Sequence, residues 1–354
     1  MKISVSVRST LLKALVLESD YRLVYKEVPD PVIRSDEVLV RVKVCGICGS
    51  DVHGLDGSTG RRRPPLIMGH EASGVIEARG TRVKRWKRGE RVTFDSTIYP
   101  LDDWYTVRGF YNLSDRRQVL GVSCGEYRRD GAFAEYVAVP QHILHKIPQG
   151  VSFEQAALTE PAAVALHAVS LTPLENTESV LVIGCGIIGI LLIQILRSRG
   201  CRVLIATDPD RERLALATGS GADIGLDPTR ENVENEVKTI TEGRGADVAF
   251  DAAGVSSSFQ TALSAVRRGA AVTLVGNLVS AVELPLQSVV TRQLRIQGSC
   301  AICGEFPSVL EMIRRKQLST DPVLSAIAPL IEGPEWFERL VRREPGMMKV
   351  LLRP

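Results

Sequence analysis

The sequence predicts an α/β protein with two domains, one rich in short β-strands and one built as a doubly wound parallel sheet. Three observations support this fold class. The chain has 354 residues, the first 160 or so carry short β-branched runs, and strand and helix patterns alternate between about residues 163 and 300. We expect the β-rich domain to cover residues 1–162 and 303–354, and the parallel-sheet domain to cover residues 163–302.

The β-rich part is predicted from apolar, β-branched segments that glycine, proline and aspartate interrupt. These segments are residues 14–17, 37–44, 74–77, 90–94 and 135–139. The tail after residue 303 shows two amphipathic helix patterns, at 307–316 and 334–343, and a last strand at 349–352. One isolated strand cannot be stable alone, so we expect the tail to rejoin the first domain.

The second domain is predicted from a strand, a glycine-rich turn and a helix that follow one another directly. Gly184, Gly186 and Gly189 have the spacing G-x-G-x-x-G after the apolar run 180–183. The first glycine permits a tight turn, the second lets a pyrophosphate approach the backbone, and the third lets helix and strand pack closely. With further strands predicted at 203–207, 248–251, 271–275 and 294–297, this is the Rossmann fingerprint of a dinucleotide site.

The choice of dinucleotide depends on Asp208, which ends the second strand 19 residues after Gly189. A carboxylate there hydrogen-bonds a free ribose 2′-hydroxyl and repels a 2′-phosphate, which favours NAD over NADP. Arg211 and Arg213 lie just beyond, where they either meet a phosphate or are solvated. The residues expected at the cofactor are Gly184, Gly186, Ile187, Ile188, Gly189, Asp208, Arg213, Val275, Gly276 and Asn277.

Composition excludes several other classes of protein. The net charge is only +3 and no basic stripe is present, so nucleic acid is not an expected partner. Seven cysteines without a disulfide pattern indicate a reducing compartment. The longest apolar run, 180–193, is too short to span a membrane. With no signal-peptide core at the N-terminus, we expect a cytoplasmic protein without a membrane partner.

Four residues of the first domain are candidate metal ligands. They are Cys48, His70, Glu71 and Glu160, and one thiolate, one imidazole and carboxylates suit Zn²⁺ with a position left open. Each also has an ordinary explanation, because a lone cysteine is usually a small buried hydrophobe and glutamates are usually surface acids. Spacing alone leaves both interpretations open.

The order of the motifs is similar to that of a known family. Cys-Gly-Ser-Asp-x-His starts at Cys48, Gly-His-Glu-x-x-Gly starts at Gly69, Glu-Pro lies at Glu160, and the glycine fingerprint follows. This pattern resembles the zinc-dependent medium-chain dehydrogenase/reductase family, and within it the sorbitol (polyol) dehydrogenase branch. The resemblance implies a GroES-like catalytic domain, a Rossmann NAD-binding domain, a small-molecule alcohol substrate and a homo-oligomer, either tetramer or dimer.

The resemblance also implies individual roles. Cys48 and His70 would bind the catalytic zinc, Glu160 matches the third ligand, and Glu71 is the zinc-adjacent glutamate with a catalytic role. Whether Glu71 or Glu160 reaches the metal directly or through water stays open. Asp51 matches the carboxylate that orients the ligand histidine. Ser50 matches the hydroxyl that passes on the substrate proton, and His53 the outer end of that relay.

Two departures from the family pattern bear on metal and substrate. The four cysteines of a structural zinc lobe are replaced by Pro100, Asp103, Thr106 and Ser114, so we expect one zinc per chain. The polyol branch carries Arg-Tyr beside its substrate where this chain has Ala301 and Ile302, so sorbitol itself is in doubt. The run Arg61–Arg63 is either an anion site or a solvated loop.

The function expected from these features is NAD-dependent oxidation of a secondary alcohol on a polyol, cyclitol or sugar-like substrate. The alternatives are a phosphorylated polyol, an amino-alcohol such as threonine, or a non-catalytic nucleotide-binding homologue. Complete ligands at Cys48, His70 and Glu160 argue against the last.

Overall fold

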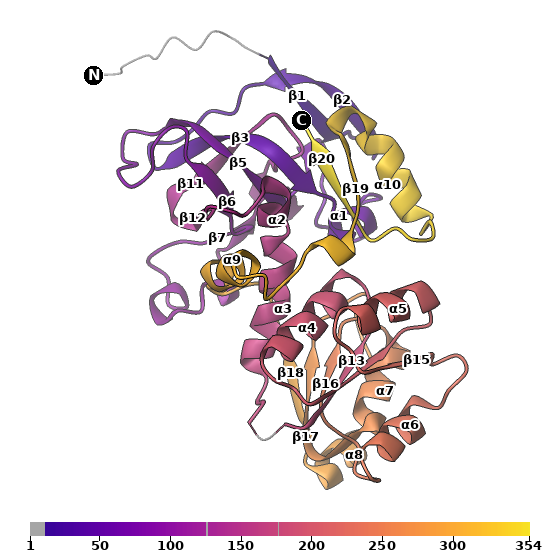
Figure 1. Cartoon of the computed structure of the whole chain (residues 1–354). Coiled ribbons are helices and arrows are strands. Elements are labelled where there is room, and N and C mark those ends of the chain that lie inside the picture. The colour runs from indigo at the N-terminus through magenta and orange to yellow at the C-terminus, as the bar shows by residue number, and fades with distance from the viewer. Residues whose placement is uncertain (1–10, 125–126, 176) are drawn as a thin grey trace. The chain divides into compact units, whose positions relative to one another are not determined.

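The computed structural model describes residues 11–124, 127–175 and 177–354, which form two compact units (Figure 1). Unit 1 comprises the described residues up to Glu160 together with Leu324–Pro354, and unit 2 comprises Pro161–Val323. The predicted fold class is confirmed, since unit 1 is β-rich and unit 2 contains a parallel sheet.

Unit 1 is organised around a seven-stranded sheet in which β3 pairs with β5, β11 and β20. The path of the sheet is β12-β6-β5-β3-β20-β19, and a second sheet has the order β2-β1-β4. Three short helices accompany them: α1 (Gly49–His53), α2 (Phe153–Ala157) and α10 (Gly333–Val341). The strands are β1 (Leu11–Leu17), β2 (Leu23–Pro29), β3 (Glu37–Gly46), β4 (Leu66–Ile67), β5 (Glu71–Arg79), β6 (Arg91–Phe94), β7 (Thr97–Ile98), β8 (Gln118–Val119), β9 (Val122–Cys124), β10 (Tyr127–Arg129), β11 (Tyr136–Pro140), β12 (Leu144–Lys146), β19 (Leu324–Pro329) and β20 (Lys349–Arg353).

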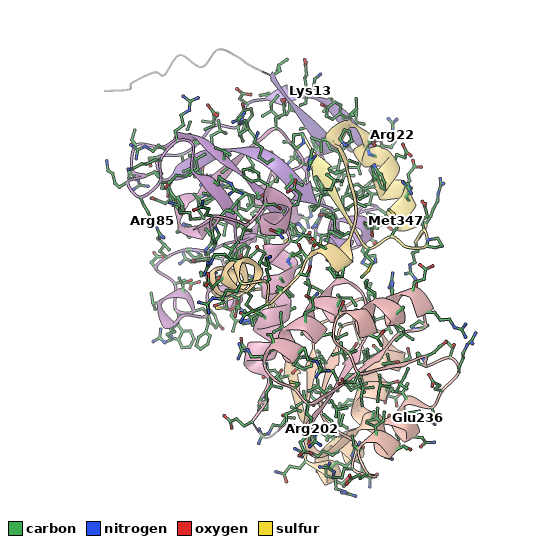
Figure 2. All side chains as sticks on the ribbon, in the orientation of Figure 1. Lys13, Arg22, Arg85, Arg202, Glu236 and Met347 are labelled. Carbon is green, nitrogen blue, oxygen red and sulfur yellow. The ribbon has the colours of Figure 1, made fainter. Side chains whose placement is uncertain are left out.

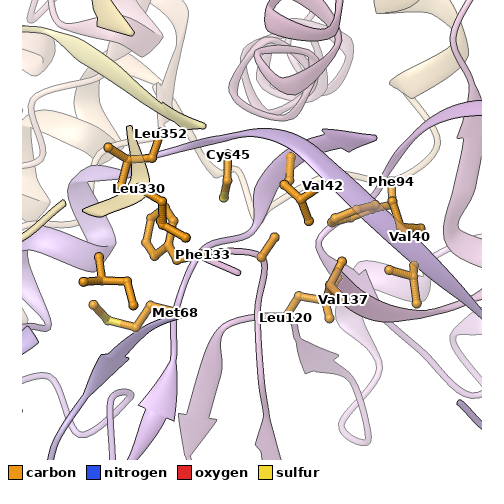
Figure 3. Close-up of a cluster of buried hydrophobic side chains, with 14 of the residues drawn as sticks. Val40, Val42, Cys45, Met68, Phe94, Leu120, Phe133, Val137, Leu330 and Leu352 are labelled. Atoms are coloured by element: carbon orange, nitrogen blue, oxygen red, sulfur yellow. The ribbon is translucent and has the colours of Figure 1, made fainter. Parts of the chain in front are cut away.

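The core of unit 1 follows from the alternating pattern of β3. Val38, Val40 and Val42 are buried, while Arg41 between them is exposed. Figure 3 shows Val40 and Val42 in a cluster of buried apolar side chains that also includes Phe133 and Leu352. Full burial of a valine side chain stabilises the fold by roughly 1.5–3 kcal/mol. The alternation along this part of β3 therefore directs one set of side chains into the core and the other toward the surface.

The C-terminal tail rejoins the first domain, as the sequence predicts. Strand β20 pairs antiparallel with β3, with Leu351 opposite Gly46 and Leu352 opposite Cys45. The expected second boundary, after residue 302, differs from the structural division after Val323. The reason is that the segment containing α9 (Phe306–Arg314) stays with unit 2, where the Gln194 side chain both donates to and accepts from the backbone of Ser319.

Unit 2 is a doubly wound sheet of six parallel strands in the order β15-β14-β13-β16-β17-β18. In the unit's own count this is 3-2-1-4-5-6, the order of dinucleotide-binding sheets. Its third strand, β15, was not predicted because it has only three residues. The elements are α3 (Thr159–Leu171), β13 (Ser179–Ile183), α4 (Ile187–Ser198), β14 (Val203–Thr207), α5 (Arg211–Gly219), β15 (Ile224–Leu226), α6 (Val233–Ile240), β16 (Ala246–Asp251), α7 (Ser256–Ala265), β17 (Val266–Leu274), α8 (Leu286–Arg292), β18 (Arg295–Gly298) and α9.

Charged side chains cover the outside of both units. Arg22, Arg85, Arg202 and Glu236 are exposed and project from the ribbon in Figure 2. Within the part of the chain that the structure describes, no helix has the length and apolar character needed to cross a bilayer.

Candidate metal centre and dinucleotide site

The pairing of β3 with β5 brings the predicted metal ligands together. Gly46 at the end of β3 lies opposite Glu71 at the start of β5. Cys48 lies two residues beyond Gly46, and His70 lies one residue before Glu71. In the resulting cluster, one ligand atom each from Cys48, His70 and Glu71 lies within 4.8 Å of the others.

Glu160, at the start of α3, is a further acid beside this trio. Its side chain is 8% exposed, and its Oε1 accepts a hydrogen bond of 2.9 Å from the hydroxyl of Ser96. Burial raises the pKa of Glu160 to about 7, with Glu71 adding to the increase and His70 opposing it. Glu160 therefore lies within electrostatic reach of the ligands His70 and Glu71.

Lys349 is a functional candidate that the sequence reasoning missed. Its Nζ lies 2.8 Å from Oε1 and 2.5 Å from Oε2 of Glu71, and it also donates to the carbonyl of Ile47. Both side chains are 1% exposed. Burial alone would lower the pKa of Lys349, but Glu71 and Cys48 hold it above its ordinary value. The sequence shows a lysine at the start of an apolar last strand, but it does not show that this lysine pairs with Glu71.

The donor set fits a divalent cation. Burial, and then the Glu71 charge, raises the pKa of Cys48 to about 12. The pKa values of this thiol and of the Glu160 carboxyl are raised because their charged forms are desolvated and are repelled by neighbouring negative charge. A bound Zn²⁺ reverses this balance, since it deprotonates a coordinating thiol outright. Sulfur, nitrogen and oxygen donors at this spacing are the set that zinc accepts.

Asp51 and Ser50, the other predicted residues of this site, lie on α1. Asp51 is fully buried, and its Oδ1 lies 3.6 Å from Nδ1 of His70. Ser50 and His53 are exposed on the same helix. The buried side chain of Arg62 donates to Asp51, a contact that the sequence reasoning did not foresee.

Of the two residues at the polyol-branch substrate positions, Ile302 is buried and Ala301 is half-buried. Neither carries a hydrogen-bonding side chain. The structure therefore gives these positions no polar group to offer to a hydroxylated substrate.

Hydrogen bonds connect three of the four positions that correspond to structural-zinc cysteines. The carboxylate of Asp103 accepts from the backbone N–H of Thr106 at 2.7 Å and from the hydroxyl of Ser114. These two bonds, the Ser114 hydroxyl first, hold the pKa of Asp103 below its ordinary value. Hydrogen bonds to Asp103 thus connect segments of this chain that a structural zinc and four cysteines connect in relatives with that site.

The glycine turn in unit 2 has the geometry that the fingerprint requires. Gly184 has φ 89°, a left-handed conformation that favours glycine, and a Cβ on Gly189 would lie 1.9 Å from the Gly184 carbonyl oxygen. A Cβ on Gly186 would meet nothing within 4 Å, so this position is open to a ligand. Helix α4 begins at Ile187, directly after the turn, and Ile187 and Ile188 are half-buried in its first turn.

The other predicted cofactor residues lie along the same sheet edge. Asp208 follows β14 and accepts the backbone N–H of Cys185 at 2.7 Å, so its carboxylate lies against the turn. The backbones of Val275 and Gly276 both donate to the Asp251 carbonyl, and Asn277 is exposed beside them. Arg213 is 40% exposed on α5 and lies 3.7 Å from Asp210. The carboxyl ends of β13, β14, β16 and β17 therefore present the expected residues together.

Two family models match this chain over the parts described above. The alcohol dehydrogenase GroES-like domain matches residues 34–149, and the zinc-binding dehydrogenase domain matches residues 188–315. These matches define the class of protein, a zinc-type alcohol dehydrogenase.

Individual relatives agree with the family models over nearly the whole chain. Sorbitol dehydrogenase of Bacillus subtilis (strain 168) is 31% identical, covering 97% of each chain. D-arabitol-phosphate dehydrogenase of Enterococcus avium is 31% identical, covering 91% of each chain. A solved structure from Sinorhizobium meliloti 1021, described as a zinc-binding dehydrogenase bound to NADP, has a TM-score of 0.89 at 29% identity and covers 98% of this chain and 100% of that one. The chain belongs to the zinc-dependent medium-chain dehydrogenase/reductase family, among its polyol dehydrogenase-like members.

The glycine turn yields a matched pair of variants. Gly189→Ala forces a Cβ against the Gly184 carbonyl, so we expect it to lower the free energy of unfolding by about 1–3 kcal/mol. Gly186→Ala meets no atom, so its free energy of unfolding should stay within about 0.5 kcal/mol of wild type while NAD binding weakens. Urea unfolding and NAD titration measure the two effects. Equal stability of both variants would contradict this account of the turn.

The raised pKa of Glu160 gives a pH-dependent prediction for the metal-free protein. The folded carboxyl holds its proton up to about pH 7, whereas an unfolded glutamate releases it near 4.5. The contribution of this proton to the free energy of unfolding is therefore complete below pH 4.5 and is lost as pH rises toward 7. Glu160→Gln cannot ionise, so its melting temperature relative to wild type should increase from about pH 5 to about pH 7.5.

Zinc should reverse this comparison, because the glutamine removes a negatively charged donor. With zinc bound, we expect Glu160→Gln to melt below wild type. A difference in melting temperature that is independent of both pH and zinc would refute the electrostatic account of this site.

Proposed function

We propose that this protein is an NAD-dependent zinc dehydrogenase that oxidises a secondary alcohol of a polyol, cyclitol or sugar-like substrate. The observation that carries the proposal is the cluster of half-buried Cys48 with buried His70 and Glu71, beside Glu160. Zinc there would act as a Lewis acid toward the substrate hydroxyl, and the nicotinamide would accept the hydride.

We propose Cys48, His70 and Glu160 as the direct zinc ligands. Distance alone favours Glu71 as the third ligand, because its carboxylate belongs to the closest trio. Charge balance favours Glu160, since both oxygens of Glu71 contact the buried ammonium of Lys349. Cys48 and Glu160 would then supply two negative charges for a divalent cation.

The proton released by the substrate hydroxyl needs acceptors in the chain. We assign this task to the hydroxyl of Ser50, which would accept the proton and pass it toward His53. Both side chains are exposed on α1, so the relay can reach solvent. We propose that Asp51, which is buried on the same helix with Oδ1 3.6 Å from Nδ1 of His70, orients the His70 ring.

Asp208 supports NAD as the cofactor. Its carboxylate lies against the glycine turn, where a ribose 2′-phosphate would be repelled. Because the Sinorhizobium meliloti structure contains NADP, the preference of this chain for NAD is tested directly below.

A phosphorylated substrate is a second candidate. The relative from Enterococcus avium is named for an arabitol phosphate. Arg61 is exposed in the loop between the two ligand motifs of unit 1, where a substrate anion could reach it.

We propose a homo-oligomer, a dimer or tetramer, in the cytoplasm. Strand β18 is an edge of the unit 2 sheet, and all four of its residues are exposed. An open strand edge is a template for pairing with another chain. Exposed apolar side chains precede and accompany it: Leu278, Leu284, Leu286, Val290 and Ile296. A second copy of the chain would cover both the strand edge and these apolar side chains.

The proposed compartment rests on the cysteines. All seven are free thiols, which suits a reducing compartment.

Cys48→Ser tests the proposed metal centre. We expect metal analysis to return about one zinc per wild-type chain, and far less for the variant. Turnover on a panel of polyols, inositols and their phosphates, read as NADH absorbance, should fall by more than the 10–100-fold typical of losing a supporting group. Cys124→Ser in β9 is the matched control and should keep both zinc and turnover. Unchanged zinc content in Cys48→Ser would remove Cys48 from the site.

Asp208→Asn tests the cofactor assignment, because asparagine keeps the shape and loses the charge. We expect the ratio of kcat/KM for NAD over NADP to fall about tenfold, which corresponds to about 1.4 kcal/mol. Asp210→Asn is the control, since Asp210 caps α5 and asparagine caps helices equally well. If both variants keep the wild-type ratio, Asp208 is structural only.

A further inference from the structure

Arg62 differs from its two neighbours in the run Arg61–Arg63. Arg61 and Arg63 are exposed, whereas Arg62 is 3% exposed. A buried guanidinium is strongly disfavoured unless an anion accompanies it. The role of Arg62 can therefore be inferred from the anion that accompanies its guanidinium.

The partner of Arg62 is Asp51, itself fully buried. Nη2 of Arg62 donates to Oδ1 of Asp51 at 2.7 Å and lies 3.4 Å from the hydroxyl of Ser50. The same Oδ1 of Asp51 lies 3.6 Å from Nδ1 of His70, and Oδ2 accepts the backbone N–H of Cys48 at 3.3 Å. One carboxylate thus contacts the backbone of one metal ligand and faces the ring of the other.

The loop that carries Arg62 is shaped to keep it there. The neighbouring Arg61 carbonyl accepts from Nη1 of Arg62 at 3.1 Å and from the backbone N–H of Ser123. A Cβ on Gly54 would lie 2.7 Å from Cγ of Arg62, so the side-chain stem packs directly on that glycine. The guanidinium is enclosed, with Nη2 on the Asp51 carboxylate and Nη1 on the Arg61 carbonyl, while the buried Nε has no hydrogen-bond partner.

We propose that Arg62 is a positioning residue of the metal centre, acting through Asp51 on Cys48 and His70. Its hydrogen bond fixes the direction of the Asp51 carboxylate. The two ligands then meet zinc in a geometry that is already set. This inference depends on the zinc site of the proposed function.

Zinc affinity of the folded protein tests the proposal. The zinc-loaded protein is titrated with a chromophoric chelator as wild type, Arg62→Met, Arg62→Lys and Arg61→Met. We expect Arg62→Met to bind zinc at least tenfold more weakly, as is typical when support for a metal ligand is lost. Arg62→Lys should recover part of the affinity because it restores the charge, and Arg61→Met should match wild type.

A second readout separates positioning from general stability. The visible spectrum of the Co²⁺-substituted protein reports ligand geometry, and we expect its bands to shift in Arg62→Met and not in Arg61→Met. A residue that merely stabilised the fold would lower the melting temperature and leave affinity and spectrum unchanged. Wild-type zinc affinity in folded Arg62→Met would overturn the proposal.

Gly54→Ala decides the question if Arg62→Met does not fold. Gly54 has φ −91°, which alanine adopts freely, while its Cβ would displace the stem of Arg62. A tenfold loss of zinc affinity in Gly54→Ala supports the proposal, and wild-type affinity overturns it. If wild type itself binds no zinc, the proposed function fails; if wild type binds zinc and no variant differs, only the role of Arg62 fails.

Discussion

The register of three neighbouring strands at Gly46 is the constraint on which the metal centre depends. Gly46 pairs with Glu71 of β5 on one side and with Leu351 of β20 on the other. A Cβ at Gly46 would lie 2.5 Å from Oε2 of Glu71, so only glycine lets that carboxylate lie across the strand. A shift of one residue in either pairing would turn the side chains to the other face of the sheet. The sheet that forms the core therefore also determines where the ligands meet.

Charge balance gives this buried site its second level of organisation. Two bases each neutralise one acid: Lys349 of the last strand pairs with Glu71, and Arg62, in the loop between Cys48 and His70, pairs with Asp51. Burial raises the pKa of Cys48 to about 12 and that of Glu160 to about 7, and the charge of Glu71 adds to both increases. A divalent cation is the group that relieves both.

In unit 2, backbone conformation rather than charge pairing shapes the predicted cofactor edge. The glycine turn leaves Gly186 open, while Gly189 packs on the carbonyl of Gly184. Asp208 ties the turn to the end of the second strand through the N–H of Cys185. Because all six strands run parallel, their carboxyl ends meet at one edge, and the segment Val275–Asn277 arrives there from β17. The position of a cofactor edge thus follows from the strand order of the sheet.

The sequence by itself determined the fold class, the glycine turn and the ligand motifs, because each is written in short-range periodicity or in local spacing. Even the last strand, 349–352, was predictable from its apolar run. Only the tertiary structure decided the partners of Glu71 and Asp51, since Lys349 is 278 residues from Glu71 and Arg62 lies in a loop with two similar arginines. It also decided that the segment holding α9 stays with unit 2. Pairings of this kind depend on strand register and on burial, which a linear pattern of residue types does not encode.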